Sequence, residues 1–213
     1  RRVRLPLFIG IVLILLLTIG FVTRSAVVAS TIDNTVKDAE ALEAAGTLEQ
    51  TEAAEKTLRT LYEKYSEEER AARAWAWQSV LQSILWGKPL LEEVKQVVTK
   101  LKLDESDISI AVRAGISVIE GKSDEALSIL GATPTNARLN LVKAAAYSAS
   151  GERKKARELL DSVISAGSSY TPLIVLAVQE ASSDNDKSAM LKYSEMLLTL
   201  SPAHFLGTMF VLL

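Results

Sequence analysis

An uninterrupted apolar run opens the chain. Residues 5–22, from Leu5 to Val22, read LPLFIGIVLILLLTIGFV and contain no charged side chain. At about 1.5 Å of rise per residue, a helix of this length approaches the ~30 Å thickness of a bilayer core. Arg4 and Arg24 stand at its two ends, where long basic side chains reach water while their stems stay beside apolar residues. The pattern predicts a transmembrane anchor over residues 1–24.

Basic residues are unevenly distributed around this run. Arg1, Arg2 and Arg4 precede it, whereas Arg24 alone follows within residues 1–24. Because basic residues gather on the cytoplasmic side of a membrane segment, we expect a cytoplasmic N-terminus and an extracytoplasmic remainder. A bacterial inner membrane with its periplasm is the expected location, and an organellar membrane is the alternative. A cleaved signal peptide fits less well, since its apolar region usually spans about 7–15 residues.

Beyond Val22 the apolar residues recur at helical spacing. The first stripe steps by three and four residues and consists of Val28, Ile32, Val36, Ala39 and Leu42. It predicts a helix with one buried face that ends near Gly46. The sequence shows no run of alternating β-branched residues and no Asn-Gly or Asp-Gly hairpin signal. We therefore expect an all-α fold, in which helical hairpins follow the transmembrane helix.

Polar residues mark where two further helices begin. Thr47 with Gln50, and Ser66 with Glu69, have the spacing of a capping box. They predict helices that run to about residues 65 and 86. The segment 25–102 is accordingly expected to form a helical linker and degenerate hairpins.

The second half of the chain repeats itself. Small and apolar residues recur at intervals of seven, five and four residues, first at Ala114, Gly121, Ala126 and Leu130. The same intervals return 30 residues later at Ala144, Gly151, Ala156 and Leu160, and a weaker copy 33 residues further on has Ala177, Asp184, Ala189 and Tyr193. Small residues let two helices approach closely, and glycine suits a turn that needs a positive φ. We expect three helical hairpins, over about 107–136, 137–169 and 170–202.

This pattern resembles the tetratricopeptide repeat (TPR) family, in which about 34 residues form two antiparallel helices. The copy from residue 137 matches best, through Ala144, Tyr147, Gly151, Ala156 and Leu160. The other copies have Ser117 and Glu180 in place of the family's tyrosine, and the third has Asp184 in place of the turn glycine. The resemblance implies a TPR-like superhelix over 103–213 that ends in an apolar helix.

The resemblance also implies a binding groove. In the TPR family, residues one turn apart on each first helix line the concave face. The matching positions here are Ala111, Gly115, Leu141, Ala145, Ile174 and Val178. None of them is polar, which implies a groove for an apolar helix or extended segment. The alternative is that the chain fills the groove itself, and residues 204–213 are apolar enough to do so or to form another hairpin, a capping helix or an interface.

Composition narrows the range of functions. The chain has no Cys and one His, His204, which excludes thiol catalysis, Cys-ligated metals and any site built on two imidazoles. Outside residues 1–24, 20 basic residues stand against 26 acidic ones, which is a poor match for nucleic acid. No phosphate-binding loop, paired-His motif or Gly-x-Ser-x-Gly elbow occurs. We expect no cofactor and no metal.

Together these features predict a non-catalytic, membrane-anchored interaction or scaffold subunit of a larger membrane or envelope complex. Its partners would be membrane or envelope proteins, and its anchor would contact the lipid bilayer. One alternative is an ancillary periplasmic chaperone beside a protein-export channel, since a single anchor with an extracytoplasmic TPR domain is similar to the layout of a bacterial translocon-associated family. An enzyme of the cell envelope is the minor alternative.

Overall fold

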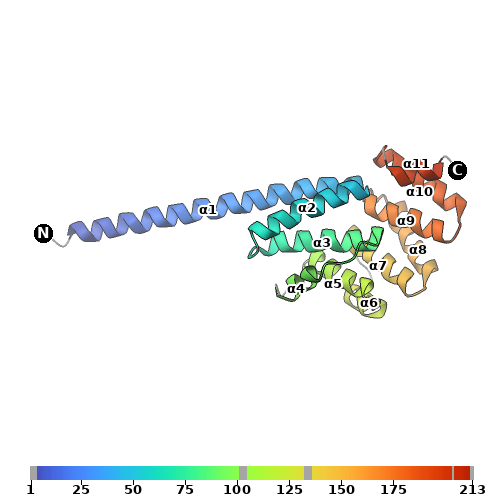
Figure 1. The fold of residues 1–213 in the computed structure, drawn as a ribbon, viewed down its shortest axis with the longest axis horizontal. Helices are drawn as coiled ribbons and strands as arrows, with labels where there is room; N and C mark the ends of the chain where they lie inside the picture. The colour runs from blue at the N-terminus through green and yellow to red at the C-terminus, as the bar shows by residue number, and fades with distance from the viewer. Residues whose placement is uncertain (1–3, 101–104, 132–135, 203, 212–213) are drawn as a thin grey trace.

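The structure, a computed structural model, is helical throughout the residues it describes (Figure 1). These are residues 4–100, 105–131, 136–202 and 204–211, without the side chains of 4–16, 100, 210 and 211. The helices are α1 (Arg4–Ala45), α2 (Leu48–Lys64), α3 (Glu69–Trp86), α4 (Glu92–Lys100), α5 (Asp107–Ile119), α6 (Ser123–Leu130), α7 (Ala137–Ala149), α8 (Arg153–Ser165), α9 (Thr171–Ser183), α10 (Lys187–Leu200) and α11 (Phe205–Val211). The described ranges contain no strand, so the all-α prediction is confirmed.

The first helix, α1, is 42 residues long and extends far beyond all the others (Figure 1). Its C-terminal part packs on the remaining helices through the predicted stripe, because Ile32, Val36 and Ala39 are buried and Val28 and Leu42 are half-buried. The second helix, α2, returns antiparallel along this part. We call helices α2–α11, together with α1 from residue 32 onward, the body.

The third helix, α3, lies at the centre of the body. Helices from both ends of the chain pack on it, namely α1, α2, α4, α5 and α9. Every side chain from 74 to 83 is buried, the polar ones included. Gln78 and Gln82 both donate through Nε2 to the carbonyl oxygen of Thr51, at 3.3 and 2.7 Å. These hydrogen bonds offset part of the cost of burying the two polar side chains.

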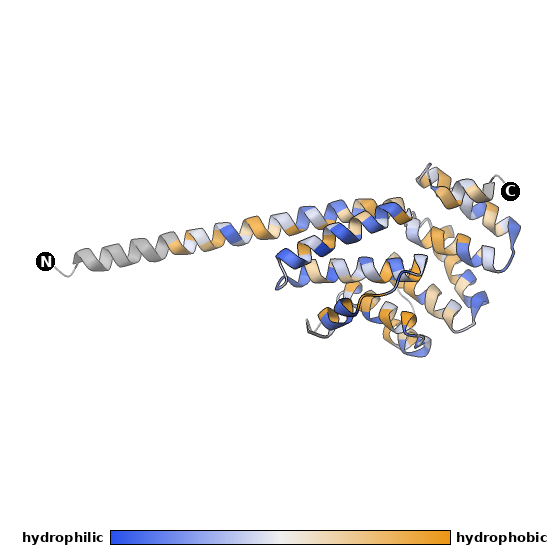
Figure 2. Cartoon of the chain, viewed as in Figure 1, coloured by the Kyte–Doolittle hydropathy of each residue, from blue (hydrophilic) through white to orange (hydrophobic). Residues whose placement is uncertain are grey.

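Helix pairs α5–α6, α7–α8 and α9–α10 occupy the three segments for which hairpins were expected, and α3–α4 precedes them. The first helices of these hairpins, α3, α5, α7 and α9, pack side by side in that order. The row also curls enough for α9 to contact α3 and α1. The apolar residues of these helices face the interior between them (Figure 2). This arrangement is compatible with a helical repeat fold.

Three of these first helices end in the same hydrogen-bonded turn, a Schellman motif. The residue that closes the turn has a positive φ of 77°, 84° or 55°, and it is Gly121, Gly151 or Asn185. The N–H of the next residue donates to a carbonyl five residues back, in the pairs Lys122 to Ser117 (2.8 Å), Glu152 to Tyr147 (2.8 Å) and Asp186 to Ala181 (2.9 Å). The structural repeat is therefore 30 residues and then 34.

This turn corrects the predicted register of the third copy. The sequence spacing assigns the turn position to Asp184, but the structure gives it to Asn185, because Asn, like Gly, tolerates the left-handed conformation. Asp184 has a φ of −90° and accepts hydrogen bonds from Arg153 and Arg157 of α8, each at 3.3 Å. The third copy is thus shifted by one residue.

The predicted packing residues lie mostly at contacts between helices. The buried ones are Ala114, Ala126, Leu130, Ala144, Ala156, Leu160, Ala177 and Tyr193, the half-buried ones are Tyr147 and Ala189, and Gly121 and Gly151 are exposed in their turns. The one-residue shift places Met190 and Ser194 where Ala156 and Leu160 lie in the preceding hairpin. Close approach of the helices therefore survives in the third copy with different side chains.

Of the two predicted helix caps, one is confirmed. The N–H of Gln50 donates to Thr47 Oγ1 at 3.2 Å, at the start of α2. The second is wrong, because α3 begins at Glu69 and its N-cap, Glu68, makes no side-chain cap hydrogen bond. Ser66 instead lies in a turn that is closed by a backbone hydrogen bond. The N–H of Glu68 donates to the carbonyl oxygen of Tyr65 at 3.0 Å.

A buried carboxylate, Glu43, joins four elements near the end of α1. Its side chain accepts hydrogen bonds from Nε1 of Trp77 on α3 (3.1 and 3.2 Å) and from Nε of Arg138 on α7 (3.3 Å). The hydroxyl of Tyr170, the N-cap residue of α9, donates to it as well. Arg138 also pairs with Glu40 at 3.0 Å. We call these five residues the Glu43 cluster.

Burial and charge together fix the protonation states of this cluster. Burial and the nearby Glu43 carboxylate raise the pKa of Tyr170 well above its ordinary value, so its hydroxyl stays a donor. Burial by itself lowers the pKa of Arg138, but the negative charges around it outweigh this and raise the pKa. The buried acid is therefore matched by one cation and two neutral donors, which offsets its desolvation.

The C-terminal residues dock at the same end of α1. His204 is buried and its Nε2 donates to the carbonyl oxygen of Gly46 at 2.9 Å. Burial lowers the pKa of His204, which favours the neutral ring. The following helix, α11, lies on α10, where a β-carbon at Gly207 would stand 2.8 Å from Cγ of Leu198. The described part of the apolar C-terminal stretch is thus a capping helix.

The left-handed turn at Asn185 can be tested by substitution. Asn185→Ala keeps the β-carbon but removes the short polar side chain that makes a positive φ tolerable, and we expect it to lower the free energy of unfolding by about 1 kcal/mol. Asn185→Gly should leave that free energy unchanged or raise it. Urea unfolding of the full chain in mild detergent measures both. A neutral Asn185→Ala together with a stabilising Asp184→Gly would return the turn to residue 184.

The Glu43 cluster makes a second prediction about stability. Glu43→Gln keeps the shape of the side chain but leaves the half-buried Arg138 without its main counter-charge, at an expected cost of about 3 kcal/mol in unfolding free energy. Glu40→Gln is the control, since the Glu40 side chain is 49% exposed and its loss should cost less than about 1 kcal/mol. Similar losses in the two variants would show that the buried carboxylate does not hold the helices together.

Candidate functional site

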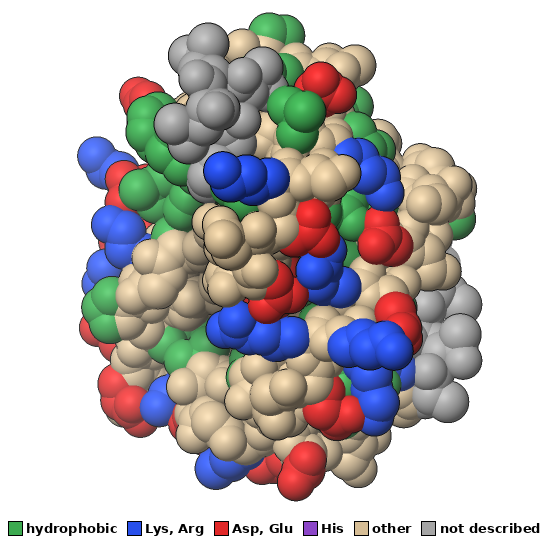
Figure 3. Space-filling model, turned by 90° about the vertical axis from the view of Figure 1, so that its right-hand side faces the viewer, with side chains coloured by type: hydrophobic (Ala, Val, Ile, Leu, Met, Phe, Trp, Pro, Cys, Tyr) green, Lys and Arg blue, Asp and Glu red, His purple; other side chains and the backbone are tan. Residues whose placement is uncertain are grey.

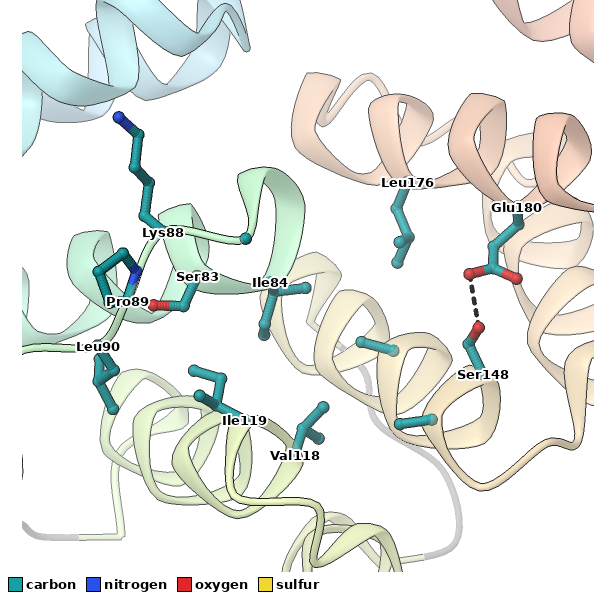
Figure 4. Close-up of a pocket in the computed structure, with 13 residues that line it drawn as sticks. Ser83, Ile84, Lys88, Pro89, Leu90, Val118, Ile119, Ser148, Leu176 and Glu180 are labelled. Atoms are coloured by element: carbon teal, nitrogen blue, oxygen red, sulfur yellow. Dashed lines mark hydrogen bonds between the residues drawn. The ribbon is translucent and has the colours of Figure 1, made fainter.

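A cavity of about 490 Å³ lies where the C-terminal ends of α3, α5 and α7 meet α9 (Figure 4). This volume is within the range of about 300–1,000 Å³ that is typical of ligand pockets. Apolar side chains from four segments form its walls: Ile84, Pro89, Leu90, Val118, Ile119 and Leu176. The exposed residues 87–89 form part of its rim, so the cavity opens to the surface. We call it the Glu180 pocket, after the carboxylate in its wall.

Glu180 is the unusual feature of this pocket. The residue is 8% exposed, and its Oε1 accepts a hydrogen bond from Oγ of Ser148 at 2.6 Å (Figure 4). Its Oε2 has no hydrogen-bond partner among the described residues. Lys88, the other charged residue of the lining, points away from the pocket and pairs with Glu52 of α2 at 2.6 Å. The pocket therefore combines apolar walls with one buried acceptor whose hydrogen bonding is incomplete.

Contacts between distant parts of the chain hold the rim in place. Nε2 of Gln179 donates to the carbonyl oxygen of Leu85 at 2.7 Å, which ties α9 to the end of α3. Gly87 ends α3 with a φ of 63°, and the pair between Lys88 and Glu52 attaches the next segment to α2. The pocket is thus formed by fixed walls before any ligand arrives.

The predicted groove residues lie inside the fold, which corrects the expectation of an open apolar groove. Five of the six are wholly buried, namely Ala111, Gly115, Leu141, Ile174 and Val178, and Ala145 is 7% exposed. The physical reason is that the row curls until α3, which packs on α5, also contacts α9, so that the first helices close on one another. A β-carbon at Gly115 would stand 2.3 Å from Cγ1 of Val80 on α3. The chain fills the groove itself, and of the six residues Ala145 lines the pocket that remains.

Glu180 departs from the repeat pattern, but the repeat pattern does not predict its place in the wall of a pocket. The corrected register aligns Ala181 with Tyr147, so Glu180 aligns with the buried Ala146. An acid at a position that is alanine in the preceding copy, near the end of the apolar run TPLIVLAVQEA, was the available signal. The participation of Ser148 carried no such signal.

The predicted membrane flanks are less fully described. Arg1 and Arg2 lie outside the described residues, as does the side chain of Arg4, while Arg24 is exposed on the free part of α1. Most side chains of the predicted anchor, residues 5–22, also lie outside the described part. In the part that is described, none of the helices combines the length and the apolarity needed to cross a membrane. Nor do three or more potential metal-ligating side chains gather there.

Charges of both signs mix on the end of the body opposite the free part of α1. Figure 3 shows basic and acidic side chains interspersed across this face. Ion pairs also join neighbouring hairpins, including Arg153 with Asp184 (3.3 Å) and Lys192 with Asp161 (2.8 Å). This face therefore offers no concentrated field of one sign for a charged polymer.

Comparison with known proteins places the chain in no family. No protein-family model, no curated protein and no solved structure matches it.

Proposed function

We propose that the protein is a non-catalytic, membrane-anchored interaction subunit that binds a segment of a partner protein in the Glu180 pocket. The observation that carries this proposal is an open, mainly apolar cavity whose wall includes the Glu180 carboxylate, one oxygen of which has no hydrogen-bond partner among the described residues. Repeat proteins of the TPR type bind partners on the surface that successive hairpins share. Here α3 covers much of that surface, and the Glu180 pocket is a part of it that stays open.

The chemistry of the pocket favours binding over catalysis. A paired acid and base would need a second titratable group beside Glu180, and the other charged residue of the lining, Lys88, is engaged with Glu52. Ser148 donates to a carboxylate, yet the nearby backbone N–H groups of Ser150 and Gly151 are bonded within the same turn. Donors that would stabilise an oxyanion beside Ser148 are therefore occupied.

The anchor is proposed from residues 5–22 and from the free part of α1 that follows them. Large apolar side chains there are 52–72% exposed, at Leu17, Ile19, Phe21, Val22 and Val27. So continuous an apolar surface is unfavourable in water, and lipid would cover most of it. Figure 2 shows hydrophobic residues continuing along this free part of the helix.

The body would then rest directly on the membrane surface. A cleft of about 900 Å³ separates α1 from the turn between α2 and α3, with Phe21 and Arg24 on one side and Lys64 and Tyr65 on the other. Aromatic and basic residues are typical of the headgroup level of a bilayer. We place this cleft at that level, and the body on the extracytoplasmic side in accordance with the arginine imbalance.

A topology experiment tests the anchor and its orientation. We expect a reporter that is active only outside the cytoplasm to be active when fused after Leu213, because residues 5–22 carry the body across the membrane. The matched control is a reporter active only in the cytoplasm, fused at the same position. Activity of the second reporter and silence of the first would overturn the proposed orientation.

A substitution that fills the pocket tests the binding role. Ala149 is an exposed residue of the lining, so Ala149→Trp should occlude the pocket with little effect on stability and abolish co-purification of the partner from mild detergent. Ala166→Trp, at the exposed end of α8 and outside the lining, is the control and should retain the partner. Equal recovery of the partner by both variants, each with an unchanged melting temperature, would show that the pocket is not the binding surface.

A further inference from the structure

The carboxylate of Glu180 has an oxygen without a hydrogen-bond partner among the described residues, which indicates the kind of group that the pocket would bind. Its carboxylate is more than nine-tenths buried, and the described residues supply it with one hydrogen bond, from Ser148. A buried carboxylate is strongly destabilised unless a cation or several donors offset its lost hydration. Elsewhere in the body such a group is fully matched, since Glu43 receives donors from Trp77, Arg138 and Tyr170. The described residues therefore provide no positively charged partner for Glu180, and a ligand could supply one.

The walls of the pocket define the rest of the ligand. Ile84, Val118 and Leu176 offer apolar surface beside the carboxylate. Long basic side chains suit such a site, because their methylene stems cover apolar surface while the charged head reaches an acceptor. A carboxylate has about four lone-pair sites on its two oxygens, so the oxygen that accepts from Ser148 can also accept from a cation. An arriving cation can thus reach a carboxylate oxygen without a backbone movement.

We infer that the Glu180 pocket recognises a segment of a partner protein in which one lysine or arginine is flanked by apolar residues. The cationic head binds the Glu180 carboxylate, and the flanking apolar side chains lie on Ile84, Val118 and Leu176. Charge complementarity selects this occupant, because an entirely apolar segment would cover the carboxylate and leave it unpaired. This inference rests on the proposed binding role of the pocket and specifies the chemistry of the partner.

Synthetic peptides test the inference with the full chain in lipid nanodiscs. The probes are Ac-Ser-Leu-Leu-X-Leu-Leu-Ser-amide, with X as lysine, norleucine or glutamate, and calorimetric titration gives their affinities. We expect the lysine peptide to bind about tenfold or more tightly than the norleucine peptide, because a hydrogen bond to a charged group is worth roughly that factor. The glutamate peptide should bind most weakly.

A pair of protein variants assigns the preference to one carboxylate. Glu180→Gln removes the charge and keeps an oxygen for Ser148, so lysine and norleucine peptides should bind it with similar affinity. Glu195→Gln makes the same change of charge at an exposed position on α10 and should keep the wild-type preference. Uptake of a given peptide by lipid is the same for every protein variant and cancels when the variants are compared, and titration into empty nanodiscs corrects the comparison between peptides.

Several outcomes would overturn the inference. They are an equal affinity of the wild type for lysine and norleucine peptides, a lysine preference that survives Glu180→Gln, and no binding of the lysine peptide at millimolar concentration. The wild-type comparison decides the matter even where Glu180→Gln does not fold. Loss of the partner in Ala149→Trp together with no lysine preference would leave the pocket as the binding surface and reject the cation. Retention of the partner in Ala149→Trp would reject the pocket itself.

Discussion

The structure depends on one buried carboxylate near the end of its longest helix. A charged group with 2% exposure must be matched by donors, and the donors of Glu43 come from three other elements that are distant in the sequence. Tyr170 is 127 residues away along the chain. Satisfying this carboxylate brings the beginnings of α7 and α9 against the end of α1. Once those contacts form, the row of hairpins is curled around α3, and its concave side is occupied.

The Glu43 cluster and the Glu180 pocket lie at opposite ends of the same two helices. Arg138 is at the start of α7 and Ser148 is near its end, while Tyr170 caps α9 at its start and Glu180 lies in its last turns. The two helices that form one wall of the pocket are therefore fixed where they begin. A pocket whose walls are set in this way loses little conformational freedom when it binds, which favours affinity.

Local features could be predicted from the sequence, and features that depend on distant contacts could not. The hairpins follow from small residues at regular spacing, and the cap at Thr47 follows from its neighbour three residues on. The part that α3 plays in filling the groove could not be predicted. This helix carries Gln78, Ser79 and Gln82, and polar residues like these do not indicate a helix that is buried on all sides. The predicted position of the third turn was wrong by one residue. Asn as well as Gly tolerates a left-handed φ, and the spacing of the repeat favoured Asp184 over Asn185.

The unbroken course of α1 has a geometric consequence for the direction in which the protein faces. A helix turns by about 100° and rises about 1.5 Å with each residue. Between Val22 and the first buried position, Ile32, α1 has no break that would absorb a change in length. With the proposed anchor in the bilayer, each residue added to this stretch would swing the mouth of the Glu180 pocket through more than a quarter of a circle in the membrane plane. The number of residues in this stretch thus sets the direction in which the pocket faces in the membrane plane. A partner embedded in the same bilayer would have to lie in that direction.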